Sequence, residues 1–324
     1  MPYKDLHEEP FDQTTIAKLE IFEDYAQAWI PTFVMRGDSI ICVFDFFAGT
    51  GYDINGVPGT PIRILKKIKE QIGNIFQKKV KVQVYLNEWE PNKKAQKKFK
   101  LLESACNDFL DNHKDVKRAI DLHLFNEDFE LLFPKLLPVI NQYPSLIYLD
   151  QNGIKFLSAK YFLELEKTRQ ADFLYFVSAS YFWRFGESEE FKVHLDIDMN
   201  AAKKDPYKFI HRNIIEQLRK KIPATSKLKL YPFSLKKGAN IHGIIFGATH
   251  PRAVDKFLSI AWKRNEINGE ANFDIDEDKG KLQLPIFGER RLTKIEEFKQ
   301  NLKEKILNKE IKNNFELLDY VYNH

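Results

Sequence analysis

The stretch SIICVFDFFAGTGYD, residues 39–53, decides the fold of this 324-residue chain. It opens with a continuous apolar run over 39–47 that holds a single acid, Asp45, near its end. Such a run is typical of a strand buried on both faces of a parallel sheet. Gly49 and Gly51 follow, and glycines at this place allow a tight turn and a close approach of a ligand to the backbone. The stretch therefore predicts the first strand of an α/β sheet, followed by a ligand-binding turn.

Downstream of this stretch, short apolar runs alternate with longer segments whose apolar residues recur every three or four positions. A similar helical stripe over residues 14–29 predicts a helix before the first strand. Strands that alternate with helices indicate a doubly wound, Rossmann-like α/β sheet, in which ligands lie at the carboxyl ends of the strands. The further strands are expected at 80–86, 118–125, 145–150 and 172–178, with helices at 61–76, 92–112, 129–142 and 157–169.

The alternation changes after residue 178. Beyond a helix near 206–221, two β-rich runs at 228–235 and 241–248 flank KKGAN, whose glycine favours a turn, and they predict an antiparallel hairpin. Parallel strands closed by such a hairpin resemble a class I methyltransferase, whereas a dinucleotide-binding domain ends with a sixth parallel strand. The expected units are an N-terminal helical segment (1–37), a methyltransferase-like α/β domain (38–265, ending with a helix at 252–264) and a small C-terminal appendage (266–324, with a polar hairpin at 269–288 and a helix at 293–308).

The composition excludes several classes of protein. Hydrophobic residues make up 44% and aromatic residues 14%, which is enough for a large core and too much for a disordered chain. Only two cysteines occur, Cys42 and Cys106, so neither a disulfide framework nor a cysteine-rich metal site is expected, and a reduced, cytoplasmic setting is favoured. The eight histidines show no metal-binding spacing, so we expect no metal site. We also expect no membrane association, because no signal peptide is visible and the longest apolar run, 173–183, is too short to span a bilayer.

Charge is segregated along the chain, although the formal net charge is only +4. Residues 1–57 contain ten acids and three bases, whereas 60–103 contain twelve bases and four acids, and 200–265 contain fifteen bases and three acids. Two basic stretches that share one face would suit a polyanion, and nucleic acid is the partner we expect. The alternative is that lysine-rich helix surfaces are simply solvated and keep the protein soluble.

The glycine turn itself indicates the type of cofactor. No Gly-Lys-Ser/Thr follows it, so it is not a phosphate loop. A dinucleotide fits poorly, because the third glycine of that fingerprint is absent and Asp45 would repel a pyrophosphate. S-adenosylmethionine (SAM) carries a cationic amino-acid chain instead, and we expect Asp45, Gly49 and Gly51 to bind it. An ordinary strand-to-helix turn is the alternative.

The ends of the second and third strands offer further cofactor ligands. Glu88 lies where an acid would accept hydrogen bonds from both ribose hydroxyls, although it follows Asp45 by 43 residues, against the usual spacing of about 20 residues between glycine loop and acid. Glu90 is the alternative ribose ligand, or both are surface acids. Asp128 is placed to accept from the adenine amino group while Phe129 packs on the ring; helix capping by Asp128 is the competing interpretation.

The ends of the fourth and fifth strands point toward the methyl acceptor. Asp150 lies beside the expected transfer position, where an acid can orient an acceptor amine or take its proton; a simple turn residue is the alternative. The residues after Asp150 are Gln-Asn-Gly. Amino-methyltransferases that act on bases have Pro-Pro-aromatic at this place, so the difference puts base methylation in doubt. Tyr181, Trp183 and Arg184 follow the fifth strand and are candidates to stack a flipped base or to line a partner groove, with core packing as the alternative.

Six ordered blocks of sequence resemble the three-Cys-motif partner (TcmP) family, bacterial proteins with a methyltransferase-like fold, over most of the chain. The resemblance carries over Asp45, Gly49, Gly51 and Asp150. It implies a partner protein, encoded by a genomic neighbour, that has three cysteines in a radical-SAM-like arrangement. The blocks are FDQTTIAKLEIFEDYAQAW, FDFFAGTGYDINGVPGTP, LDQNGIKFLS, DFLYFVSASYFWRF, FGATHPRAVDKFLSIAWK and NGEANFDID.

Two hypotheses of function follow. The first is a SAM-dependent methyltransferase that acts on nucleic acid or another polyanion and works with the three-cysteine partner. The second is a catalytically altered binding or recognition subunit of that partner, in a mobile-element or defence context. The sequence leaves open the substrate, the methylated atom and the oligomeric state.

Overall fold

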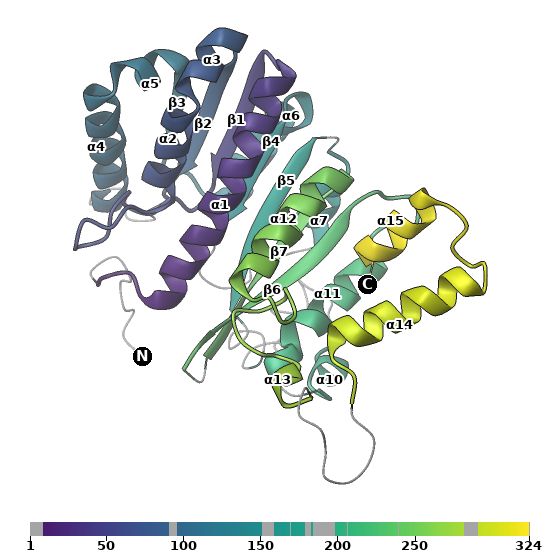
Figure 1. Ribbon diagram of the computed structural model, residues 1–324. Helices are drawn as coiled ribbons and strands as arrows, with labels where there is room; N and C mark the ends of the chain where they lie inside the picture. The colour runs from purple at the N-terminus through teal and green to yellow at the C-terminus, as the bar shows by residue number, and fades with distance from the viewer. Residues whose placement is uncertain are drawn as a thin grey trace.

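The computed structural model describes residues 9–90, 96–150, 159–168, 170–178, 183, 198–205, 207–238, 240–281 and 291–323. Seven strands form one mixed sheet (Figure 1). The strands are β1 (Ile40–Asp45), β2 (Lys81–Asn87), β3 (Ile120–Phe125), β4 (Ser145–Leu149), β5 (Ala171–Ser178), β6 (Lys229–Lys237) and β7 (Asn240–Ala248).

The order of the strands is β3-β2-β1-β4-β5-β7-β6. Strands β1 to β5 are parallel, whereas β7 is antiparallel to both β5 and β6. The chain moves outward from β1 to β3 and then returns to β4 on the other side of β1, so the order reverses between β1 and β4. This confirms the doubly wound sheet closed by an antiparallel hairpin, which is the class I methyltransferase topology.

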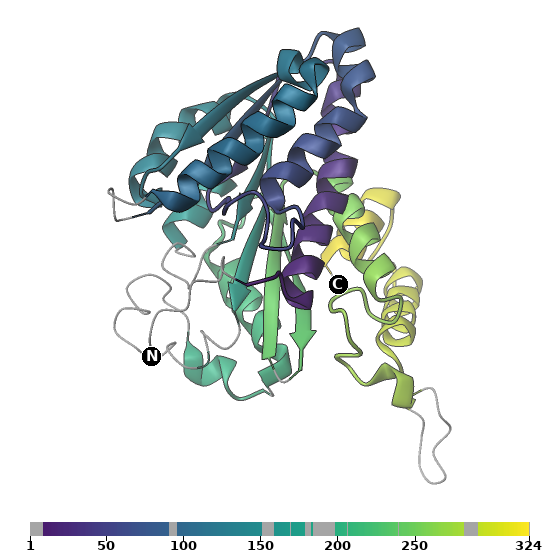
Figure 2. The same cartoon turned by 90° about the vertical axis from the view of Figure 1, so that its left-hand side faces the viewer.

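Helices cover both faces of the sheet, because successive strand side chains point to opposite sides (Figures 1 and 2). Two apolar clusters result, one beneath α1 and one beneath α6 and α11. On the first face lie α1 (Gln13–Arg36), α2 (Thr60–Glu70), α3 (Ile72–Lys78), α4 (Lys97–Asn112), α5 (Lys114–Ala119) and α12 (Pro251–Arg264). On the second face lie α6 (Phe129–Gln142), α7 (Ala159–Glu166), α10 (Met199–Ala202) and α11 (Ile210–Lys221).

Helix α1 crosses its face of the sheet in the direction opposite to the parallel strands. Near its beginning, Phe11 N donates to Asp53 Oδ2 at 2.8 Å in the loop that follows β1. At its other end, Arg36 pairs with Asp38, just before β1 begins. The helix continues past the predicted residues 14–29 and stops at Gly37, which takes a left-handed φ of 85°. The first turns of α1 therefore lie at the carboxyl edge of the sheet.

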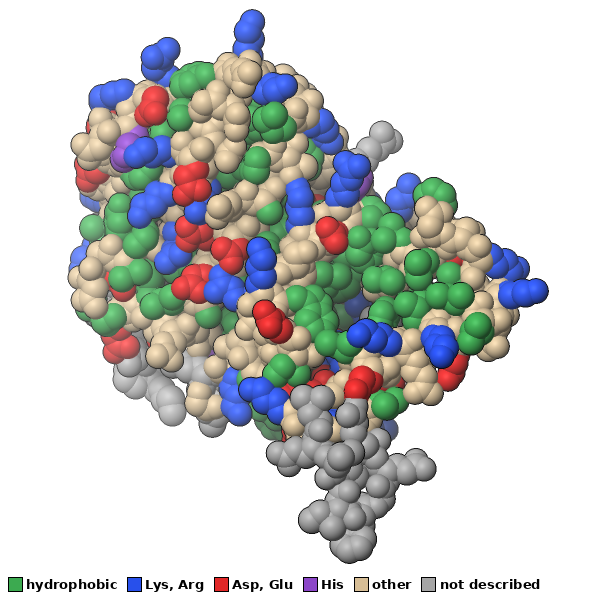
Figure 3. All heavy atoms as spheres, in the orientation of Figure 1, with side chains coloured by type: hydrophobic (Ala, Val, Ile, Leu, Met, Phe, Trp, Pro, Cys, Tyr) green, Lys and Arg blue, Asp and Glu red, His purple; other side chains and the backbone are tan. Residues whose placement is uncertain are grey.

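Acidic residues on α1 neutralise bases from both basic stretches. Glu23 pairs with Arg63 of α2, whereas Glu20 and Asp24 pair with Arg264 of α12. Acidic and basic side chains are correspondingly interspersed along the middle of this face (Figure 3). The two basic stretches lie toward opposite edges of the sheet, around β2 and around β6.

The C-terminal part departs from the expected hairpin at 269–288. Within the described part of that range, Ala271 instead forms a parallel bridge with Ser234 of β6, and a short helix follows. Thr293 begins the next helix, as expected, and the structure shows that it does so with a capping box. Residues 282–290 lie outside the described residues. No described helix is both long and apolar enough to cross a membrane. The helices here are α13 (Asp278–Lys281), α14 (Lys294–Leu307) and α15 (Asn314–Asn323).

Candidate functional site

Three carboxyl side chains lie at the carboxyl edge of adjacent strands. Asp45 ends β1, Glu88 follows β2 and Asp150 follows β4, and these three strands are neighbours in the sheet. Each acid lies two residues after a core residue beneath α1, so the alternation of side chains places all three on that face. Gly49 N donates to Glu88 Oε2 at 2.8 Å, which ties the glycine turn to the end of β2. The fold thus brings together residues that the sequence keeps apart.

Asp45 is the most buried acid of this cluster, with 1% of its surface exposed. Its Oδ1 accepts a hydrogen bond from Phe47 N at 3.0 Å, whereas Oδ2 has no hydrogen-bond partner among the described residues. Burial raises the pKa of Asp45 well above its ordinary value, and the charges on Asp150 and Glu88 raise it further. The hydrogen bond from Phe47 N opposes this rise. The environment favours the protonated acid, and a cation bound at Oδ2 would favour the ionised form.

Lys18 of α1 supplies an ammonium group to the cluster. Its Nζ pairs with Asp150 Oδ2 and lies 4.1 Å from the centre of the Phe176 ring in β5. Only 6% of Lys18 is exposed. One turn earlier, the Thr14 hydroxyl is buried and lacks a hydrogen-bond partner in the part of the chain that the structure describes. Sequence reasoning missed Lys18, although its spacing from Thr14 and Phe22 places it on the buried stripe of α1, where a lysine is unusual.

Tyr148 adds a second buried polar group beneath the cluster. Its hydroxyl has no hydrogen-bond partner within the described ranges. Burial raises the pKa of this hydroxyl, and the charges on Asp150 and Asp45 raise it further. The ring packs on Phe22 of α1, with 4.3 Å between ring centres. Helix α1 therefore covers buried polar side chains at the ends of β1 and β4.

The glycine turn has a fixed shape. Gly49 and Gly51 take left-handed φ values of 68° and 88°. A Cβ added to Gly51 would lie 2.7 Å from the Cβ of Ala105, so the turn presses against α4. The Asp53 carboxylate then accepts hydrogen bonds from the backbone N–H groups of Phe11, Asn55 and Val57. The turn is held from both sides before any ligand binds.

The side chain of Asn87 joins the ends of β1 and β2 to the loop after β3. Its Nδ2 donates to Phe46 O at 3.2 Å and to Glu127 O at 3.0 Å, and its Oδ1 accepts from Glu127 N at 3.1 Å. Only 2% of Asn87 is exposed. Asn87 is the last residue of β2, and an amide directly after the apolar run Val84–Leu86 is the signal that could have identified it.

Glu88 and Glu90 have different partners. Glu90 Oε2 accepts from the backbone N–H groups of Lys98 and Phe99, at 2.8 and 3.3 Å, and so caps α4. Glu88 contacts the glycine turn instead. Of the two candidate ribose ligands, the geometry favours Glu88.

Asp128 and Phe129 occupy the start of α6. Asp128 Oδ1 accepts from Glu130 N at 2.8 Å, so it caps the helix. Phe129 is 1% exposed and packs against Phe46 and Tyr161, with ring centres 5.2 and 5.0 Å apart. The capping alternative is present, and the Phe129 ring lies in the core. An adenine contact by either residue stays a prediction.

The remaining predicted residues are more dispersed. Tyr181 and Arg184 lie outside the described residues, as do 151–153 after Asp150. Trp183 packs against Tyr207, with 5.3 Å between ring centres, next to the apolar cluster of the second face. Within the described ranges, no group of three or more His, Cys, Asp or Glu side chains could hold a metal ion.

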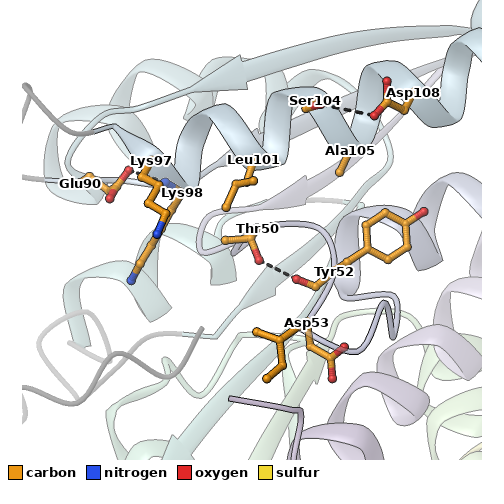
Figure 4. Close-up of a pocket in the computed structure, with 11 residues that line it drawn as sticks. Thr50, Tyr52, Asp53, Glu90, Lys97, Lys98, Leu101, Ser104, Ala105 and Asp108 are labelled. Carbon is orange, nitrogen blue, oxygen red and sulfur yellow. Dashed lines mark hydrogen bonds between the residues drawn. The ribbon is translucent and has the colours of Figure 1, made fainter. Parts of the chain in front are cut away.

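A cavity of about 400 Å³ lies on the other side of the glycine turn, between residues 50–54 and α4 (Figure 4). It does not include Asp45, Glu88 or Asp150, so it is separate from the carboxyl cluster. Its walls are Thr50, Tyr52, Asp53, Ile54, Glu90, Lys97, Lys98, Leu101, Ser104, Ala105 and Asp108.

Comparisons with known proteins add little to this geometry. No protein-family model matches the sequence, and no curated protein is significantly similar. Among solved structures, an O-methyltransferase from Bacillus cereus in complex with S-adenosylhomocysteine (SAH) has 12% sequence identity and a TM-score of 0.32, and the match covers 74% of this chain and 91% of that one. The strand order and the antiparallel β7 establish the fold independently of that likeness. The resemblance to the TcmP family stays a prediction.

Proposed function

We propose that the protein binds SAM at the carboxyl edge of β1, β2 and β4 and transfers its methyl group. The observation that carries the proposal is Asp45 Oδ2, a buried carboxyl oxygen without a hydrogen-bond partner among the described residues. Three acids converge here, and Lys18 pairs with one of them. A cationic ligand is what such a cluster lacks, because a buried carboxylate is stable only when paired.

Each residue of the cluster has a place in this proposal. Asp45 and the glycine turn hold the cationic amino-acid part of SAM, Glu88 holds the ribose, and Asp128 lies at the adenine end. Asp150, oriented by Lys18, faces the methyl acceptor. SAM supplies the electrophilic methyl group. The protein contributes position and electrostatics, which are the main means of catalysis in a direct displacement.

Nucleic acid is the substrate class we propose, with the three-cysteine protein as partner and the cytoplasm as location. Support for a polyanion comes from the basic stretch 60–103, whose helices α2 and α4 both lie against the glycine turn at Gly51. The partner rests on the TcmP resemblance alone.

Isothermal titration calorimetry with SAM tests the proposal. We expect binding to release a proton, because a cation beside Asp45 lowers the pKa that burial has raised. Repeating the titration in buffers of different ionisation enthalpy measures that proton. Asp45→Asn should weaken SAM binding and abolish the release. Asp172→Asn is the matched control, since Asp172 is also a buried acid but lies at the start of β5.

Two results would contradict the proposal. One is the absence of SAM binding by the wild-type protein. The other is an Asp45→Asn variant that binds SAM as tightly as wild type with the same proton release.

A second candidate function is a SAM-binding recognition subunit without transferase activity. The Lys18 pair favours it, because that pair already engages Asp150, the acid expected to serve the acceptor. SAM binding without methyl transfer to RNA or DNA, together with co-purification of the three-cysteine protein, would select this function over the first.

A further inference from the structure

We propose that the cavity between the glycine turn and α4 is a nucleotide-binding subsite, distinct from the SAM site. It would take one nucleotide whose base carries an exocyclic amino group. Its role in holding a nucleic-acid substrate rests on the proposed function, whereas nucleotide binding itself does not. The volume of about 400 Å³ falls within the range of about 300–1,000 Å³ found for small-molecule sites.

The α4 wall of the cavity is one stripe of the helix. Lys97, Lys98, Leu101, Ser104, Ala105 and Asp108 line it, and their spacing by threes and fours places them on one side of the helix. The residues between them, such as Leu102 and Cys106, are buried in the core. From Lys97 to Asp108 the stripe extends about 16 Å at 1.5 Å per residue, which is long enough for a base, a ribose and a phosphate in line.

The middle of the cavity is apolar and exposed. Leu101 on α4 is 48% exposed, and Ile54 on the opposite wall is 58% exposed. Large aliphatic side chains on two walls of one cavity offer apolar surface to a flat ring. Trp89 is 45% exposed and directly precedes Glu90 of the cavity wall, so it offers a stacking surface to a neighbouring base.

The two ends of the cavity differ in charge. Lys97 and Lys98 lie at one end, at the start of α4 (Figure 4), and their ammonium groups suit a phosphate. Glu90 lies at the same end, where its carboxylate accepts from the backbone N–H groups of Lys98 and Phe99. At the other end, Ser104 Oγ donates to Asp108 Oδ2 at 3.3 Å. A carboxylate there can accept from the amino group of adenine, cytosine or guanine, whereas uracil has no amino group and offers only its N3–H, which is flanked by two carbonyl oxygens that repel a carboxylate. The cavity therefore orients a nucleotide with its phosphate at the lysines and its base toward Asp108.

The cavity also adjoins the proposed cofactor site. Thr50, which lies between Gly49 and Gly51, forms part of its wall. Its hydroxyl donates to Tyr52 O at 2.7 Å and so belongs to the rigid turn. A nucleotide bound here would be separated from SAM only by that turn, which is where a neighbouring nucleotide of a substrate strand would lie.

The test compares Leu101→Asp with Leu131→Asp. Both leucines are exposed helix residues, but Leu131 is 65% exposed on α6, on the opposite face of the sheet. Fluorescence anisotropy with a labelled single-stranded RNA of mixed sequence, together with calorimetry with AMP and UMP, measures nucleotide binding. Leu101→Asp should weaken RNA binding at least about tenfold, which is about 1.4 kcal/mol, and Leu131→Asp should not. Circular dichroism with equal melting temperatures confirms that both variants are folded.

The other outcomes of these binding measurements either identify the ligand of the cavity or overturn the inference. Loss of AMP binding along with RNA in Leu101→Asp identifies a site for a free nucleotide, and loss of RNA alone identifies a strand. The inference is overturned if wild type binds neither RNA nor AMP, if UMP binds as well as AMP, or if the two variants bind alike. It is also overturned if Leu101→Asp loses SAM, because the cavity is then part of the cofactor site. RNA binding that depends on Leu101, without SAM binding by wild type, leaves the subsite standing and removes the proposed methyltransferase.

Discussion

At the scale of single residues, the acids at the carboxyl edge of the sheet differ in the partners that stabilise their negative charge. Asp150 has the ammonium of Lys18, whereas Asp45 receives one backbone N–H and is otherwise enclosed. Charges 4 Å apart interact by about 4 kcal/mol at an effective dielectric constant near 20, several times more than in water. A ligand that brings positive charge to Asp45 therefore gains binding free energy, whereas an anionic ligand such as a pyrophosphate would be repelled. This selectivity is what separates the site from a dinucleotide site.

The Lys18 pair can be tested without any ligand. Lys18→Met removes the ammonium and leaves Asp150 partly buried, so we expect the free energy of unfolding to fall by about 1–3 kcal/mol. The double variant Lys18→Met/Asp150→Asn should recover much of that loss, and urea unfolding measures all three. Lys114, which pairs with Asp111 on the surface, is the control, and Lys114→Met should cost less than about 1 kcal/mol. Equal losses for the two lysines would show that the buried pair is unimportant.

At the scale of elements, the sequence predicts the helices and strands that a local pattern determines. It misses features that depend on contacts between distant parts of the chain. The strands fall within two residues of their predicted bounds, because buried runs flanked by turns are distinctive. Gln71 divides the single helix predicted at 61–76 into α2 and α3, and Gly73, two residues further on, is the local signal for that break. Helix α5 was missed because its six residues carry no apolar stripe.

The same limit applies to the candidate site. Asp45, Glu88 and Asp150 could be predicted together, because the carboxyl ends of parallel strands meet at one edge. Lys18 could not be assigned, because it meets Asp150 across 132 residues of sequence. The cavity beside α4 was missed for the same reason, since the loop at 50–54 and the helix become neighbours only in the fold.

The glycine turn yields a prediction of its own. Gly51→Ala should destabilise the protein by about 1–3 kcal/mol, because it combines a left-handed φ with a contact of 2.7 Å to Ala105 Cβ. Adding Ala105→Gly should relieve the contact and leave only the backbone strain. Gly56→Ala is the control, since Gly56 has a φ of 75° but open space around its Cα, and about 1 kcal/mol is expected. Urea unfolding in which Gly51→Ala matches Gly56→Ala would contradict the packing of the turn on α4.

At the scale of the whole molecule, α1 connects the two halves of the sheet. Its acids pair with α2 on one side and α12 on the other, and its Tyr25 hydroxyl donates to Asp172 Oδ2 of β5 at 2.7 Å. The chain segregates charge along its length, and the fold brings the opposite charges back together.

Asp172 makes the stability of the whole fold depend on pH. Burial raises its pKa to about 6, above the value near 3.9 in an unfolded chain. The folded state therefore holds this proton more tightly, and the stabilisation is complete below about pH 4 and is lost as the pH rises through 6. We expect wild type to lose about 2–3 kcal/mol relative to Asp172→Asn between pH 4 and pH 7. Urea unfolding across that range measures the difference, and parallel pH profiles would contradict the assignment.

The contact of α1 with α12 also sets the order in which a newly made chain can finish folding. Asp24 and Arg264 are 240 residues apart, so α1 leaves the ribosome well before the helix that it pairs with. At about 5–20 residues per second, that interval is roughly 10–50 s. During it, Tyr25 lacks the Phe246 and Phe257 rings that later cover it. The apolar side of α1 therefore stays partly uncovered for that interval of translation.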